Sequence, residues 1–195
     1  MGFFTSSIMK RLKELKLLYK ISHDKDPEAF AELYDGYVTK IYRFVYFKVS
    51  NKEEAEDLVS EIFLKSWYYL TGDNAKEVKS FSGFIYRMAR NMIVDLYRER
   101  ARNREVPESS IEQLSFLEKS IEEKIMIQSD TEQILRKLKY LKQEYQDVVL
   151  LKYMEELSAP EIAHILGKSK TNVRVTLHRA MKIIREMMDV EQGRK

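Results

Sequence analysis

A chain of 195 residues, 44% of them hydrophobic, can form one large domain or two small ones, each with its own core. The chain has no cysteine, which excludes a disulfide framework and thiolate zinc sites, and its three histidines are too scattered for a closed metal site. The net charge is only +3, but the basic and acidic residues lie in separate segments.

Two basic segments flank an acidic one. Residues 87–104 hold six arginines, residues 164–185 hold many Lys and Arg, and residues 105–123 are rich in glutamate. This pattern indicates two nucleic-acid contacts and a connector that avoids DNA. No apolar run approaches the length of a membrane span, and the N-terminus lacks the core of a signal peptide. We therefore expect a cytoplasmic protein without membrane insertion.

The first half predicts three long helices after an N-terminal extension, residues 1–24, which contains a short basic helix or a frayed tail. The first long helix starts at Asp26-Pro27, an N-cap followed by proline at the first helical position, and ends near Val49. A capping box at Ser50–Glu53 starts the second, over about residues 51–70. Both carry apolar residues at helical spacing.

The second predicted helix has an acidic face. Glu54, Asp57 and Glu61 are spaced three and four residues apart and share one side. Such a face is commonly no more than a solvated surface that also stabilises the helix dipole. Here apolar Leu58 and either Phe63 or Trp67 border the same face, which favours a surface for a protein partner.

A polar loop over residues 71–80 precedes the third helix, which Ser80 or Ser82 caps. Its outer side displays Arg87, Arg90, Asn91, Asp95 and Arg98. Aromatic residues near the loop, among them Phe81 and Phe84, stand beside these arginines, as stacking on unpaired bases requires. The alternative is that the aromatic residues are core and the arginines only solubilise, and for Phe81 and Phe84 core is at least as well supported.

Residues 105–128 contain Pro107 and a Glu/Ser-rich run with sparse apolar positions, which predicts an extended or weakly helical linker. Helices are expected again over residues 129–195. No strand pattern of useful length occurs, so the expected fold is all-α: an N-terminal helical domain over residues 25–104 and a C-terminal helical domain over residues 129–195.

The segment 157–188 predicts a helix-turn-helix. Ser158 and Glu161 form a capping box, Gly167 allows the left-handed backbone that ends the short helix, and Ser169 can cap a longer one. The longer helix combines one apolar stripe with an exposed basic surface and has no acidic residue before Glu186. This arrangement is typical of a second helix that enters a DNA major groove, although a helical hairpin with a solvated basic face would share it.

Catalytic motifs are missing from the sequence. There is no Gly-rich phosphate loop, nucleophile elbow or His-Glu metal motif. Asp57 and Glu61 could exchange protons in principle, but an exposed helix face supplies no pocket. We therefore expect no catalytic residue, no metal, no cofactor and no small-molecule substrate.

Four segments match, in order and spacing, the pattern of one known family. They are D-P-E-A-F-A-E-L-Y-D-G-Y-V-T-K-I-Y (26–42), A-E-D-L-V-S-E-I-F-L-K-S-W (55–67), F-S-G-F-I-Y-R-M-A-R-N-M-I-V-D-L-Y-R-E-R (81–100) and R-V-T-L-H-R-A (174–180). Over about residues 26–188 the chain thus resembles the extracytoplasmic-function (group IV) sigma factors, bacterial RNA polymerase subunits of the sigma-70 family.

The resemblance implies partners and site residues. It implies that the chain binds core RNA polymerase, at the β′ clamp helices and the β flap, and promoter DNA, with a separate anti-sigma factor as a common regulator. The residues that match the core-binding positions are Asp57, Leu58, Glu61, Phe63 and Trp67. Those that match the positions for the −10 promoter element are Asn74, Ser80, Phe81, Arg87, Arg90, Asn91, Asp95 and Arg98. Those that match the positions for the −35 element are Lys170, Thr171, Asn172, Arg174, Val175, His178 and Arg179.

The chain also departs from the family pattern. Phe84 stands where the family usually has Trp. The loop over residues 71–80, which matches the family's loop that captures an unpaired base of the −10 element, is slightly longer than usual. The resemblance further implies that the linker threads toward the polymerase active-site channel.

Three other functions remain open: a stand-alone helix-turn-helix regulator, a protein–protein adaptor and, more distantly, an RNA-cleaving enzyme.

Overall fold

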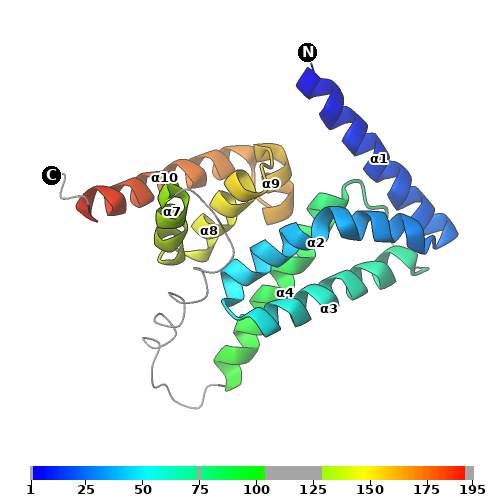
Figure 1. Ribbon diagram of the computed structural model, residues 1–195, viewed down its shortest axis with the longest axis horizontal. Coiled ribbons are helices and arrows are strands. Elements are labelled where there is room, and N and C mark those ends of the chain that lie inside the picture. The colour runs from blue at the N-terminus through cyan, green and yellow to red at the C-terminus, as the bar shows by residue number, and fades with distance from the viewer. Residues whose placement is uncertain (1, 74–75, 104–128, 192–195) are drawn as a thin grey trace. The chain divides into compact units, whose positions relative to one another are not determined.

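The computed structural model describes residues 2–73, 76–103 and 129–191, and over these ranges it contains helices and no strand (Figure 1). The chain divides into two compact units at residues 104 and 105. The prediction of an all-α fold is confirmed. The linker predicted over residues 105–128 lies outside the described residues. Among the described residues, no helix combines the length and the apolar character that crossing a membrane requires.

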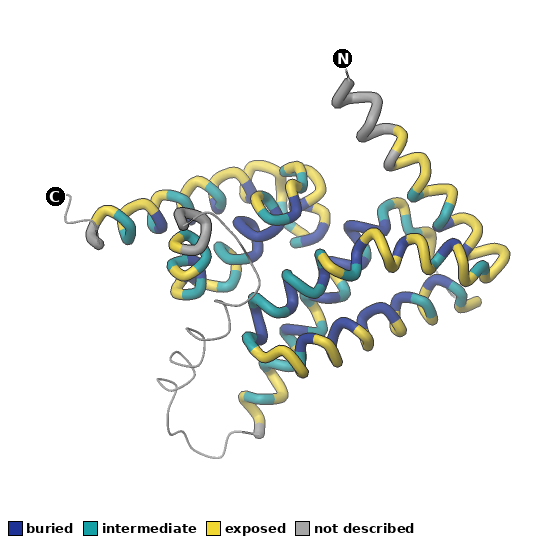
Figure 2. Tube along the Cα trace, in the orientation of Figure 1, coloured by how far each residue is buried: buried dark blue, intermediate teal, exposed yellow. Residues whose placement is uncertain are grey.

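The first unit consists of α1 (Gly2–Asp24), α2 (Pro27–Val49), α3 (Lys52–Thr71) and α4 (Phe81–Asn103). The last three pack on one another, and α1 packs against α2 and α3. Each helix turns one side inward (Figure 2). The core is built from aliphatic and aromatic side chains, including Ile21, Leu33, Ile41, Phe44, Val45, Ala55, Val59, Ile62, Phe63, Phe81, Ile85, Tyr86 and Ile93.

The N-terminal extension expected over residues 1–24 is one long helix in the structure. Leu18 and Ile21 of α1 are buried against the other helices. Burial of these two side chains makes α1 part of the first unit.

Local capping chemistry sets where the helices begin. The Asp26 carboxylate accepts hydrogen bonds from the backbone N–H groups of Glu28 (2.9 Å) and Ala29 (3.1 Å), as expected of an N-cap. The bond from Ala29 is the main cause that lowers the pKa of Asp26. The capping box predicted at Ser50–Glu53 is wrong. Ser50 takes a left-handed conformation that ends α2, and Asn51 caps α3 by accepting from the Glu54 N–H (3.0 Å).

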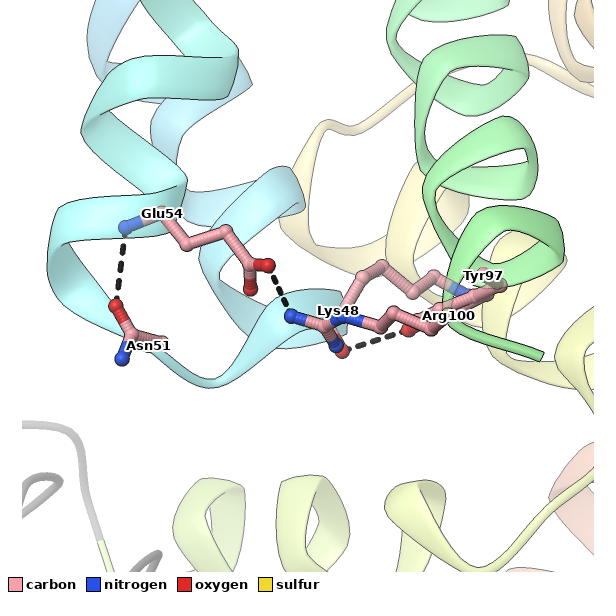
Figure 3. A network of polar contacts seen from close by, with 5 residues as sticks. All are labelled: Lys48, Asn51, Glu54, Tyr97 and Arg100. Atoms are coloured by element: carbon pink, nitrogen blue, oxygen red, sulfur yellow. Dashed lines mark hydrogen bonds and ion pairs between the residues drawn. The ribbon is translucent and has the colours of Figure 1, made fainter. Parts of the chain in front are cut away.

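Polar contacts join the C-terminal half of α4 to the turn between α2 and α3 (Figure 3). The Tyr97 hydroxyl donates to the backbone carbonyl of Lys48 (2.7 Å), and Arg100 forms an ion pair with Glu54. Glu54 therefore serves the packing of α4 and is turned away from the exposed acidic face that the sequence predicts for it.

The second unit contains α7 (Ser129–Lys139), α8 (Gln143–Val149), the π-helical turn η1 (Leu150–Met154), α9 (Ala159–Leu166) and α10 (Lys170–Glu191). The last helix packs against α7, α8 and α9. Of the predicted apolar stripe, Val173, Ala180 and Ile184 are buried, whereas Leu177 and Met187 are half-buried. The other core residues include Leu138, Val148, Leu150, Leu151, Ile162 and Ile165.

The predicted helix-turn-helix is confirmed in its local chemistry. The Ser158 N–H donates to the Glu161 carboxylate (2.8 Å) within a capping box. Gly167 ends α9 with φ +64°, and the Lys168 N–H bonds to the Ala163 carbonyl (2.9 Å). Ser169 then accepts from the Asn172 N–H (3.1 Å) at the start of α10.

Candidate protein-binding and nucleic-acid interfaces

One exposed face of α3 combines acidic and apolar side chains. Asp57, Glu61, Leu64 and Tyr68 are spaced four, three and four residues apart, which places them on one side of the helix. All four are exposed, Leu64 to 54% and Tyr68 to 65%. We call these four residues the α3 ridge. Exposed aliphatic and aromatic side chains beside carboxylates suit a protein partner with basic and apolar groups.

The apolar residues predicted for this surface lie mostly beneath it. Leu58 and Phe63 are buried, Phe63 to 3% exposure. Trp67 is half-buried and packs edge-on against Phe30, with ring centroids 5.2 Å apart. Leu58 and Phe63 are therefore not part of the exposed surface of the α3 ridge. Its exposed apolar side chains, Leu64 and Tyr68, were missed, although their spacing from Asp57 and Glu61 was readable in the sequence.

The carboxylates of α3 differ in their surroundings. Glu61 pairs with Lys65 one turn on (2.7 Å), and Glu56 pairs with Lys52 (3.8 Å). Asp57 is exposed and pairs with no basic side chain of the described residues. An exposed ion pair one turn apart is worth little and exchanges readily, so both ridge carboxylates can meet a basic partner.

The predicted polar side of α4 forms one exposed face. Arg87, Asn91, Asp95 and Arg98 are exposed, and their spacing of four, four and three places them on the same side. Arg90 is half-buried at the edge of this face. The Arg98 guanidinium lies 3.2 Å from Asp95. The face presents three arginines and an amide, which can contact phosphates and base edges.

The entry into α4 corrects one predicted contact. Ser80, half-buried, accepts a hydrogen bond from the Gly83 N–H (3.2 Å) and so caps the helix. Phe81 has no exposed surface, and its ring packs edge-on against Tyr37, with centroids 5.2 Å apart. Its position among the DNA-contacting residues is therefore corrected to a core position, because the packing of α2 covers it. Asn74 lies outside the described residues.

An aromatic surface next to the start of α4 comes from two other residues. Tyr69 of α3 is 39% exposed and lies against half-buried Phe84, with ring centroids 5.0 Å apart. Tyr86, the next aromatic residue along α4, is buried against Phe44. Tyr69 was missed because it lies on α3, before the loop, whereas Phe84 follows the loop on α4, and only the packing of α3 against α4 brings the two rings together.

The N-terminal half of α10 presents the residues that were predicted to contact DNA. All are exposed: Lys170, Thr171, Asn172, Arg174, Val175, His178 and Arg179. The Thr176 hydroxyl contacts the Asn172 amide oxygen (3.2 Å). On the opposite side Val173, Thr176 and Ala180 are buried. The structure thus brings the predicted residues together on one exposed surface with three basic side chains and an imidazole.

An ion pair holds the turn that precedes α10. Lys168 donates to the carboxylate of Glu144 on α8 (2.9 Å), and this hydrogen bond is the main cause that lowers the pKa of Glu144. The contact links the turn before α10 to α8. Among the described residues there is no cluster of three His, Cys, Asp or Glu that could hold a metal ion.

Two family models match the chain in order. The model for sigma-70 region 2 matches residues 33–103, and that for sigma-70 region 4 matches residues 131–184. Curated relatives agree. SigL of Mycobacterium tuberculosis, named an ECF RNA polymerase sigma factor, is 30% identical over 78% of this chain and 85% of its own length. SigW of Bacillus subtilis is 29% identical over 93% of this chain and 96% of its own.

A longer relative, BldN of Streptomyces coelicolor, is 26% identical over 84% of this chain, which spans 61% of the BldN length. Among solved structures, CnrH in complex with the cytosolic domain of CnrY shares the fold with a TM-score of 0.68 at 18% identity, over 91% of this chain and 98% of that one. The sigma factor RpoE of Bartonella quintana, solved with the anti-sigma factor NepR, has a TM-score of 0.58 at 18% identity. The match covers 83% of this chain and 97% of that one.

The two helical units, their order and these relatives together define the class. The chain belongs to the extracytoplasmic-function sigma factors of the sigma-70 family, which are transcription initiation factors that do not themselves catalyse a reaction. Membership in this family favours a polymerase-dependent role over a stand-alone helix-turn-helix regulator.

Proposed function

We propose that this chain binds core RNA polymerase and directs it to specific promoters. One observation carries the proposal. The chain contains two helical units in the order that the family has, and each unit displays an exposed cationic helix face, on α4 in the first and on α10 in the second. A regulator that only binds duplex DNA needs the second unit and has no use for the first.

In this proposal the α3 ridge binds the clamp helices of the β′ subunit. Asp57 and Glu61 meet basic residues of the polymerase, and Leu64 and Tyr68 provide the apolar contact that the carboxylates surround. Leu58, Phe63 and Trp67 hold the ridge in position from beneath. The second unit makes the additional contact with the β flap.

The loop before α4 and the exposed face of α4 bind the −10 element. Opening DNA costs about 1.4 kcal/mol per base-pair step, and stacking of each unpaired base on an aromatic side chain returns roughly 1–3 kcal/mol. Tyr69 and Phe84 offer such a surface beside Arg87 and Asn91. The captured strand is then held by stacking and by phosphate contacts to the arginines.

The exposed surface of α10 reads the −35 element in the major groove. Recognition helices contact base edges with residues near their N-terminus, where Arg174 and His178 lie. An arginine can bind guanine with two hydrogen bonds, while Lys170 and Thr171 at the helix start reach phosphates.

The proposal also covers the protein's catalytic role, its location in the cell and its regulatory partner. The polymerase performs the chemistry, so we infer that the chain is not an enzyme and that it acts in the cytoplasm, where the bacterial polymerase works. An anti-sigma factor is included as a partner that would cover the polymerase-binding surfaces. RpoE, which shares the fold, was solved with such a protein.

The function is tested by adding the purified chain to core RNA polymerase with fragmented DNA from its own genome. We expect promoter-directed transcripts that appear only with both proteins present, and co-purification of the chain with the core enzyme. Tight duplex binding by the free chain, together with no core complex and no transcript, would contradict the proposal and favour a stand-alone regulator.

The apolar part of the α3 ridge gives a separate prediction. Replacing Leu64 and Tyr68 together by alanine should weaken core polymerase binding about tenfold or more, because apolar and aromatic anchors dominate interface energies. Thermal stability should change little, since both side chains are exposed. Titration of labelled protein against core polymerase measures the loss. Unchanged affinity would remove Leu64 and Tyr68 from the interface.

A further inference from the structure

A single carboxylate joins three helices at the start of α4. One oxygen of Glu14, on α1, accepts a hydrogen bond from the backbone N–H of Phe81 (2.6 Å). Its other oxygen accepts from the hydroxyl of Tyr37 on α2 (2.7 Å). Glu14 is half-buried and is the only acidic residue between Met1 and His23. It lies outside residues 33–103, which match the region 2 family model.

The position of this carboxylate has a clear physical effect. The first N–H groups of a helix lack partners within the helix, and a negative charge at that end is stabilised by the helix dipole. Ser80 satisfies the Gly83 N–H, and Glu14 satisfies that of Phe81. The junction between the preceding loop and α4 is therefore held by one cap from its own segment and a second from α1.

Tyr37 completes the arrangement, since its hydroxyl fixes Glu14 while its ring packs against Phe81 (centroids 5.2 Å apart). We call Glu14, Tyr37 and Phe81 the α4 clamp. Phe81 in turn lies 6.3 Å, centroid to centroid, from Phe84, which contacts exposed Tyr69. The clamp thus supports from behind the aromatic surface that faces outward at the start of α4.

We propose that Glu14 is a positioning residue for recognition of the −10 element: it touches no DNA itself and holds the loop and the first turn of α4 in the conformation that accepts the unpaired strand. The inference rests on the proposed function. Without the clamp the junction samples other conformations, and the apparent affinity for the strand falls in proportion to the fraction of molecules that remain competent.

The test measures open-complex formation by holoenzyme assembled with variant chains, on a promoter found in the transcription experiment above. Glu14→Ala should lower open-complex formation about tenfold, the scale of losing a helix cap, and should reduce discrimination between the natural −10 element and base-substituted ones. Affinity for core polymerase should stay within about twofold, because the α3 ridge is unchanged.

Two further variants separate positioning from general stability. Glu14→Gln should recover most of the activity, since its amide oxygen can accept from the Phe81 N–H while its NH₂ donates to the Tyr37 hydroxyl. Tyr37→Phe should act in the same direction as Glu14→Ala but less, because it keeps the ring contact with Phe81 and removes only the hydroxyl.

Glu32→Ala is the matched control. Glu32 forms an exposed ion pair with Lys13 of α1, so its removal loosens α1 on α2 without touching α4. It should behave as the wild-type chain does. Equal opening by Glu14→Ala and wild type, an equal loss in Glu32→Ala, or a loss of core affinity that matches the loss of opening would each overturn the inference. A wild-type chain that directs no transcription would instead overturn the proposed function.

Discussion

Reversal of the two ridge carboxylates, Asp57→Arg with Glu61→Arg, is expected to abolish binding of core RNA polymerase. Both side chains are exposed on one face of α3, so the substitution should leave the helix intact. In the complex, each new arginine would face basic residues of the partner, and a like-charge contact both loses an attraction and adds a repulsion. We expect affinity to fall at least about 100-fold, since each tenfold change corresponds to only about 1.4 kcal/mol.

Glu56→Arg provides a control on the same helix. Glu56 is exposed and pairs with Lys52, and its direction lies about 100° around the helix from Asp57. This single reversal should retain most of the affinity. Circular dichroism checks helix content, and competition with a labelled sigma factor for core polymerase measures binding. Wild-type affinity in the double variant would remove the α3 ridge from the polymerase interface.

The second large effect is expected on α10. Arg174→Glu with Arg179→Glu should eliminate transcription that depends on the −35 element while leaving core polymerase binding within a few-fold of wild type. Loss of a single arginine that reads a base costs about 1–3 kcal/mol, and a glutamate in its place also repels the phosphates. Both residues are exposed and lie away from the buried stripe of α10, so the second unit should keep its fold.

Arg185→Glu is the matched control for α10, since Arg185 is exposed on the same helix eleven residues beyond Arg174. Recognition helices use their N-terminal part, so this reversal should cost little. Promoter pairs with intact and scrambled −35 elements measure the difference. A protein–protein adaptor would tolerate the changes at Arg174 and Arg179, and unaltered −35 dependence in the double variant would support that function.

Several features followed from short segments because their causes are local. The capping box of Ser158 and Glu161 and the left-handed Gly167 involve neighbours within a few residues, so their residue types suffice to predict them. The exposure of the α10 residues that are predicted to contact DNA also follows locally, since a helix with one apolar stripe must turn its basic side outward.

The choice between Ser50 and Asn51 as cap of α3 shows where local information ends. Both residue types cap helices well, and the sequence favoured the capping box at Ser50. In the structure Ser50 closes α2 with a left-handed backbone, so Asn51 takes the extended conformation of an N-cap. The tight connection between the packed helices α2 and α3 therefore determines which of the two residues is the N-cap of α3.

The same limit applies to the α3 surface. Helical periodicity places Leu58 and Phe63 at the two borders of the face that carries Leu64 and Tyr68, but it does not say which of these apolar side chains are exposed. Contacts with Phe30 and Tyr34 on α2 place Phe63 inside, Leu58 is buried as well, and Leu64 and Tyr68 are left exposed.

The helical class, the order of the two units, the helix-turn-helix and the basic surface of α10 could all be predicted from the amino-acid sequence, because periodicity, caps and charge act over a few residues. The burial of Phe81, the contact between Tyr69 and Phe84, and the cap that Glu14 provides to a helix 67 positions further along the chain became apparent only in the folded chain. These contacts join distant segments, and packing of α1, α2 and α3 around α4 is what brings such segments within hydrogen-bonding or van der Waals distance.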